Sequence, residues 1–112
     1  MSGITTHVLD TSAGRPAAGV PVTLEKQAGS GWQSIGHGVT NQDGRITDLL
    51  GGSKLAVGTY RLTFDTGTYF SATKQASFYP QVQVTFTVLD ASQHYHVPLL
   101  LSPFGYSTYR GS

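Results

Sequence analysis

Hydrophobic and polar residues alternate along most of this chain. The clearest stretch is "QVQVTFTVLD" (81–90), where from 81 to 88 every second residue is apolar and the residues between are Gln or Thr. Successive side chains of a strand point to opposite faces, so this pattern predicts a strand with one buried face. "TYRLTFDT" (59–66) and "GVPVTLEKQ" (19–27) repeat the alternation, and Pro21 indicates a strand start or an edge. The positions predicted to face the core are Val20, Val22, Leu24, Tyr60, Leu62, Phe64, Val82, Val84, Phe86 and Val88.

The remaining elements follow from weaker alternation and from turn residues. Further strands are predicted at 4–10, 32–39, 45–49, 94–101 and 105–110. The turn sequences between strands are "SAGRPAAG", "AGSG", "NQDG", "GGSK" and "LDASQ". Only "TYFSATKQASF", spanning about 69–78, favours a short helix, which would stop before Pro80. About eight short strands with frequent turns predict an all-β sandwich of antiparallel sheets, and the length of 112 residues predicts one domain, 1–112.

Composition narrows the possible partners. The formal net charge is +1 and only 12% of residues are charged, which argues against nucleic acid. The chain has no cysteine, so disulfides and thiolate chemistry are excluded. No apolar stretch approaches the roughly 20 residues of a membrane span, and "MSGITTHVLD" has no leader pattern, so we expect a cytoplasmic protein. A surface with so few charges favours burial against a partner subunit.

Histidines are the first candidates for chemistry. His94 and His96 are two residues apart in a predicted strand, so both side chains leave the same face. Three interpretations are open for His96: a structural histidine, a general base or substrate contact, or a zinc ligand. A zinc site would combine the His-x-His pair with His7, although carboxylate or cysteine ligands are lacking.

Arginine and tyrosine add two further candidates. Arg45 follows the turn "TNQDG", where it is either a solvated cation or a forked donor for a carbonyl or an anionic ring. Near the C-terminus, "SPFGYSTYRGS" is either an edge strand with a loose tail or part of a site. Alternation there places Tyr106, Thr108 and Arg110 on one face and Ser107 and Tyr109 on the other.

Four blocks of the sequence together resemble one known family. They are "THVLDTSAGRPAAGVPVTLE", "TNQDGRI", "SFYPQVQVTF" and "HYHVPLLLSPFGYSTYRGS", and they extend through the whole chain in this order. The blocks resemble the transthyretin-related family, and the closing Tyr-Arg-Gly-Ser resembles its branch of 5-hydroxyisourate hydrolases rather than the hormone carriers.

The resemblance implies a fold, an assembly and an activity. It implies a transthyretin-like (prealbumin-like) sandwich that assembles as a homotetramer, a dimer of dimers, with sites in a channel between the dimers. The implied reaction is hydrolysis of 5-hydroxyisourate to 2-oxo-4-hydroxy-4-carboxy-5-ureidoimidazoline in urate breakdown, with no metal or organic cofactor.

The resemblance also implies a set of site residues. His7 and His96 would be the base and its partner, and Arg45 would anchor the substrate and stabilise the developing oxyanion. Tyr109 would contact the substrate together with His7 and Arg45, and Ser112 would orient a histidine through its hydroxyl or carboxylate. Which histidine takes the proton stays open at this point.

Two other classes of protein remain as alternatives. A transthyretin-type carrier would bind small aromatic ligands in the same channel, but such a pocket favours an apolar lining. A structural sandwich domain of a secreted protein would also fit "GVPVTLE" and "DGR", and it predicts a leader peptide and neighbouring domains.

Overall fold

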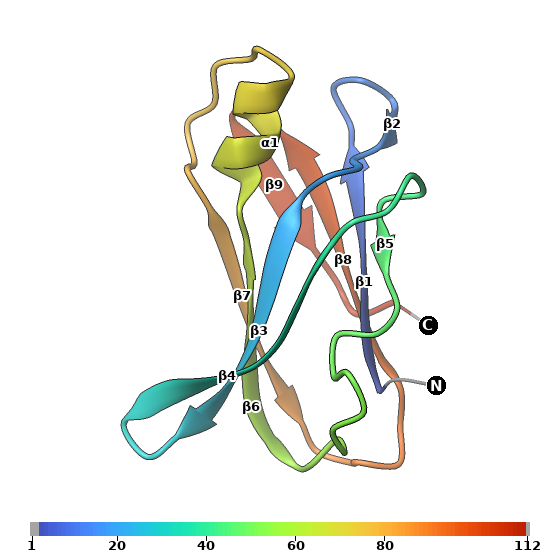
Figure 1. Cartoon of the computed structure of the whole chain (residues 1–112), viewed down its shortest axis with the longest axis vertical. Helices are drawn as coiled ribbons and strands as arrows, with labels where there is room; N and C mark the ends of the chain where they lie inside the picture. Colours follow the sequence, from blue (N-terminus) through green and yellow to red (C-terminus); the bar gives the residue numbers. More distant parts are fainter. Residues whose placement is uncertain (1–2, 112) are drawn as a thin grey trace.

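The structure, a computed structural model, describes residues 3–111, which form two β-sheets and one short helix (Figure 1). In chain order the elements are β1 (Ile4–Asp10), β2 (Arg15–Pro16), β3 (Pro21–Ala28), β4 (Gly31–Val39), β5 (Arg45–Ile46), β6 (Gly58–Phe64), α1 (Thr66–Ala72), β7 (Val82–Val88), β8 (Tyr95–Ser102) and β9 (Gly105–Thr108).

The two sheets pack face to face as a sandwich (Figure 1). One sheet has the order β2-β1-β8-β9, with β5 also paired to β1, and the other has the order β4-β3-β6-β7. The predicted all-β sandwich is therefore confirmed. One pair departs from the antiparallel prediction, because β1 and β8 run parallel. Parallel neighbours need a long connection, and here most of the chain lies between the two strands.

The alternation found in the sequence corresponds to the buried face of each strand. All three apolar positions predicted in β6 are buried. The predicted positions Val22 and Leu24 in β3, and Val20 just before it, are buried as well. In β7, Val82 and Val88 are buried, while Val84 and Phe86 pack against the core from a partly buried position. The core prediction is thus confirmed at each of these positions.

Several boundaries differ from the prediction. The strand expected at 45–49 contains only Arg45 and Ile46, because the chain then turns away and buries Leu49 and Leu50 instead. A two-residue strand, β2, lies inside a segment that was predicted to be a turn. The last strand ends at Thr108 rather than at 110.

The helix begins and ends earlier than predicted. It spans Thr66–Ala72 instead of 69–78, because the Asp65 side chain accepts the backbone N–H of Thr68 and caps the first turn. Lys74 has a positive φ of 59° just after the helix, a conformation that stops regular winding. In Figure 1 the helix lies at one end of the sandwich, between β6 and β7.

A buried hydrogen bond attaches this helix to the other sheet. The Tyr69 hydroxyl donates to Asp10 Oδ2 at 2.6 Å, and Asp10 is only 2% exposed. Burial and the Asp10 carboxylate raise the pKa of Tyr69 to about 12, so the phenol remains a donor at neutral pH. Burial alone would raise the pKa of Asp10, but hydrogen bonds from Tyr69, Ser12 and Ala13 outweigh it and lower that pKa.

Replacing Tyr69 with Phe should lower the free energy of unfolding by about 1.5–3 kcal/mol at pH 7, the usual worth of a hydrogen bond to a charged group. The folded-state pKa of Asp10 lies below its ordinary 3.8, so this stabilisation is present above pH 3.8 and is lost as the pH falls through the lower folded value. Urea unfolding at pH 7 and pH 3 measures both effects. Equal losses at the two pH values would contradict the charged pairing.

Candidate active site

The register of β1 places candidate residues beside one another on the outer face of the five-stranded sheet. His7 on β1 is opposite Arg45 on β5, and Thr5 on β1 is opposite His96 on β8. The inward residues of β1, Ile4, Thr6 and Val8, are fully buried, so the alternate residues Thr5 and His7 face outward. The residues singled out on β1, β5 and β8 therefore share one side of one sheet.

A tight turn holds Arg45 in place. The Asn41 side chain accepts the backbone N–H groups of both Asp43 and Arg45, and the Val8 N–H donates to the Gly44 carbonyl at 2.7 Å. Gly44 has a φ of +75°, and a Cβ there would be 2.4 Å from the Val8 carbonyl oxygen. The close approach of the turn backbone to β1 therefore requires glycine at position 44, and this approach places Arg45 beside His7.

The C-terminal segment packs directly on His96. The Gly111 N–H donates to the His96 carbonyl at 2.8 Å in an antiparallel bridge. A Cβ on Gly111 would be 2.6 Å from His96 Cδ2 and 3.3 Å from Pro98 Cγ. Only a glycine lets the chain lie this close to the imidazole. The predicted convergence of the C-terminal segment with His96 is present up to Gly111, and Ser112 lies outside the described residues.

The two residues before Gly111 point to opposite sides. Continuing the β8–β9 register places Tyr109 on the His96 face, where its side chain is 56% exposed. Arg110 points the other way: its guanidinium lies over the Tyr95 ring at 4.4 Å and donates to Gln93 Oε1 at 2.8 Å. Its side chain therefore anchors the segment and does not face the imidazoles.

The site is electrostatically positive around its two histidines. Burial and the nearby Arg45 guanidinium lower the pKa of His7, although a backbone hydrogen bond with Asp43 and the Asp43 charge act in the opposite direction. Burial also lowers the pKa of His96, with additional contributions from Arg45, His7 and His94. Both imidazoles are therefore held neutral near pH 7, where they can accept or share protons.

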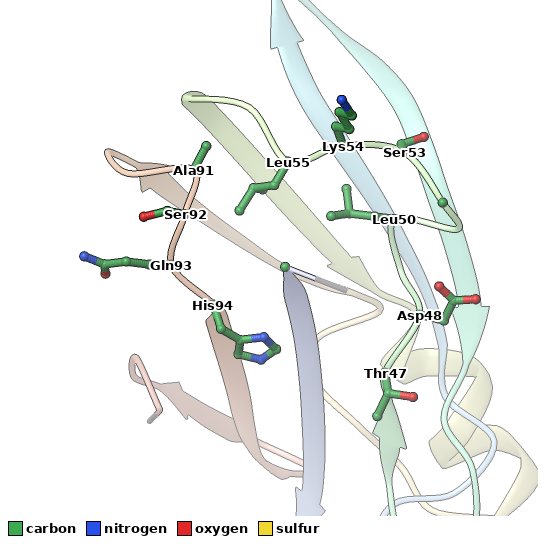
Figure 2. A pocket seen from close by; sticks show the side chains of 12 residues that line it. Thr47, Asp48, Leu50, Ser53, Lys54, Leu55, Ala91, Ser92, Gln93 and His94 are labelled. Carbon is green, nitrogen blue, oxygen red and sulfur yellow. The ribbon is translucent and has the colours of Figure 1, made fainter. Parts of the chain in front are cut away.

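A large cavity lies next to this face rather than on it. A cavity of about 860 Å³ is formed by the loops at 47–55 and 91–94, and His94 lies on its wall (Figure 2). His7, Arg45 and His96 do not line it. In a single chain these three residues instead form an open shelf on the sheet.

Residues 3–111 contain neither a grouped set of metal ligands nor a membrane-spanning helix. Within residues 3–111 no three or more His, Cys, Asp or Glu side chains are grouped so that they could hold a metal ion. The zinc interpretation of His7, His94 and His96 therefore has no supporting geometry in that range. In the same range, no helix has the length and apolar character needed to cross a bilayer.

Comparison with known proteins identifies the family. The sequence model of the HIUase/Transthyretin family matches residues 4–111. The chain belongs to this family. A 5-hydroxyisourate hydrolase of Salmonella dublin is 48% identical over 109 residues, which cover 97% of this chain and 80% of the relative.

Similar solved structures include both a 5-hydroxyisourate hydrolase and a transthyretin. The 5-hydroxyisourate hydrolase of Klebsiella pneumoniae is similar at a TM-score of 0.86 and 38% identity, covering 99% of this chain and 100% of that one. Sea bream transthyretin in complex with thyroxine has a TM-score of 0.92 and 31% identity, covering 98% and 95%. Both branches of the HIUase/Transthyretin family thus share this backbone, and only side chains can distinguish them.

Sequence reasoning found most of the residues on the shelf and missed one. His7, Arg45 and His96 are brought together, and Tyr109 lies on the same face. Thr5 was not predicted, yet its hydroxyl contacts two imidazoles. Its position two residues before His7 already indicated the same face of the strand.

Replacing Arg45 with Met should raise the pKa of both His7 and His96, because the positive charge that disfavours their protonation is removed. Burial still acts on both rings, so neither pKa should exceed its ordinary value of 6.5 by much. Proton NMR titration of the histidines measures the shifts, and Arg45→Lys should change them less. Arg61→Met is the matched control, because Arg61 pairs with Glu25 in the other sheet. Unchanged pKa values in Arg45→Met would contradict the charge arrangement.

Proposed function

We propose that this protein is a 5-hydroxyisourate hydrolase that opens the ring of 5-hydroxyisourate to give 2-oxo-4-hydroxy-4-carboxy-5-ureidoimidazoline. The observation that carries the proposal is the shared face of His7, Arg45 and His96, with the C-terminal segment packed on His96. The hydrolase names of relatives from Salmonella and Klebsiella support the same activity.

These side chains supply the three functions that hydrolysis of a cyclic amide needs. One of the two neutral imidazoles takes a proton from water, and the water oxygen bonds to the ring carbonyl carbon. Arg45 stabilises the negative charge that develops on the carbonyl oxygen. The ring C–N bond then breaks, and the nitrogen receives the proton removed from water. Atoms and charge balance with no further reactant.

The residues from the C-terminal segment complete the proposed site. Tyr109 lies on the face of His96 with its ring exposed, and we assign it a contact with the flat heterocycle. Ser112 keeps its proposed role as an orienter of a histidine, a role that rests on the family resemblance.

The alternative is a carrier that binds without reaction, and the backbone alone does not decide against it. The sea bream carrier is at least as similar in shape as the Klebsiella enzyme. The polar shelf supports hydrolysis, since two neutral histidines beside a guanidinium suit proton transfer better than binding of an apolar ligand.

We also propose that the protein is a homotetramer whose shelves are covered by partner subunits. An open shelf cannot exclude water by itself, and catalytic electrostatics are stronger in an enclosed site. Low charge and the transthyretin-like backbone favour the same assembly.

Activity should depend on both histidines. Urate oxidised immediately beforehand supplies the substrate, and the decay of its ultraviolet absorbance follows hydrolysis. His7→Asn and His96→Asn should each lower kcat by roughly 10²–10⁴, the usual worth of a positioned acid–base group. The double variant should lose much less than the product of the two, because the groups act together. An inactive wild-type chain would favour the carrier, and near-normal rates in both single variants would contradict the assignment.

Replacing Gly111 with Ala should impair catalysis without unfolding the protein. The new Cβ must displace the His96 ring or the C-terminal segment, and displacements near 1 Å cost roughly 10- to 100-fold in rate. Gly105→Ala is the matched control on β9, because its Cβ would meet only Ser102 Oγ at an ordinary 3.7 Å. Light scattering checks that both variants keep the wild-type assembly. Equal rates for both would show that the segment has no role in the site.

A further inference from the structure

The Thr5 hydroxyl lies between two imidazoles. Its Oγ1 is 2.7 Å from His96 Nδ1 and 2.9 Å from His94 Nε2. Thr5 is 6% exposed although it belongs to the outer face of the sheet, because these neighbours cover it. The hydroxyl therefore forms hydrogen bonds with both rings and joins β1 to His96 in β8 and to His94 just before this strand.

Proton counting links the tautomers of the two rings. A hydroxyl has one hydrogen, so Thr5 can donate to only one imidazole and must accept from the other if both bonds are made. In one arrangement His94 Nε2–H donates to Thr5, and Thr5 donates to His96 Nδ1. In the reverse arrangement His96 Nδ1–H donates to Thr5, and Thr5 donates to His94 Nε2.

The other nitrogen of His94 distinguishes these arrangements. Its Nδ1 is buried and has no hydrogen-bond partner among residues 3–111. The reverse arrangement would put a proton on this nitrogen and bury an N–H without an acceptor, which folded proteins rarely tolerate. The first arrangement leaves only a lone pair there and satisfies every N–H of His94.

We propose that His94 and Thr5 are positioning residues that hold the proton of neutral His96 on Nε2, so that His96 is the hydrogen-bond donor of the site and His7 is the base. The inference rests on the proposed function for these two roles, while the tautomer itself belongs to the protein without substrate. The hydrogen bonds of His96 described above use Nδ1 and the backbone, which leaves Nε2–H for a bound molecule.

The proton path follows from this assignment. His7 takes the proton of water as the water oxygen bonds to the carbonyl carbon. That proton then passes from His7 to the ring nitrogen as the C–N bond breaks. His96 keeps its own proton throughout and donates a hydrogen bond to the substrate.

The charges around His96 are consistent with a donor that stays neutral. His7 on β1, Arg45 on β5 and His94 just before β8 are the charged or titratable groups that act on His96, and with burial they lower the pKa of His96. Burial and Arg45 lower the pKa of His7, and a backbone hydrogen bond with Asp43, as when an imidazole donates to a carbonyl, opposes this shift only in part. A neutral His7 that donates one N–H in this way has its second nitrogen free to accept a proton.

The tautomers can be read directly from long-range proton–nitrogen NMR spectra of histidine-labelled protein at pH 7.5, without substrate. We expect wild-type His94 and His96 each to carry the proton on Nε2. Thr5→Val keeps the shape but removes the hydroxyl, so His96 should become a mixture of tautomers, whereas Thr5→Ser should restore the wild-type pattern. Thr6→Val is the matched control: it removes a buried threonine hydrogen bond to the Val97 carbonyl, 2.6 Å long, without touching either imidazole.

Kinetics of the same variants add a second measurement. Thr5→Val should lower kcat by roughly 10- to 100-fold with little change in KM, because the substrate still binds beside a misdirected imidazole. Thr5→Ser should recover most of that loss, and Thr6→Val should stay close to wild type in rate. If Thr5→Val does not fold, His94→Leu breaks the same chain of hydrogen bonds at its other end. His96 should then also become a mixture of tautomers.

The outcomes separate this inference from the proposed function. A proton on His96 Nδ1 in the wild-type protein, or a tautomer unchanged in Thr5→Val, would overturn the inference whether or not the chain hydrolyses 5-hydroxyisourate. Conversely, an inactive wild-type protein with the expected tautomers would contradict the proposed hydrolase function but would still support the hydrogen bonds from His94 through Thr5 to His96.

Discussion

The parallel pairing of β1 with β8 is the constraint on which the rest of the site depends. It brings residues 91 positions apart within hydrogen-bond distance, as for Thr5 and His96. Its register is fixed by the core, since Ile4 and Val8 on β1 and Val97 and Leu99 on β8 must all face the other sheet. A slip of one residue would turn the histidines inward and the core residues outward, so burial of the apolar face also fixes the polar one.

The two faces of the five-stranded sheet have different roles. The inner face, together with the second sheet and the Tyr69–Asp10 hydrogen bond, stabilises the fold. The outer face bears His7, Arg45 and His96, with Tyr109 at its side. Because the backbone is shared with a thyroxine-binding transthyretin, a change of function within the family needs changes only on such a surface. The proposed hydrolase therefore owes its chemistry to side chains that contribute little to the core.

Backbone geometry gives two glycines a direct part in the site. Gly44 allows β5 to approach β1 closely enough to set Arg45 beside His7, and Gly111 allows the C-terminal segment to lie against His96. Because neither glycine has a side chain, the main chain can approach its neighbour closely at both positions. Neither glycine takes part in the reaction, yet both determine where the reacting side chains lie. For this reason each glycine occurs in a recognisable motif together with the residues that it positions.

The sequence by itself determined the class of fold, the buried positions of its strands and the main polar candidates. Alternation with a period of two is a local property, and it identifies the buried face of a strand before any partner is known. Helix limits were less accurate, because the Asp65 cap and the positive φ of Lys74 ended α1 earlier than its composition suggested. The tertiary structure alone decided that β1 and β8 are parallel, that Arg110 turns away to Tyr95, and that Thr5 joins two imidazoles. These features depend on contacts between distant segments, whose register follows from packing of the whole core and not from any local pattern.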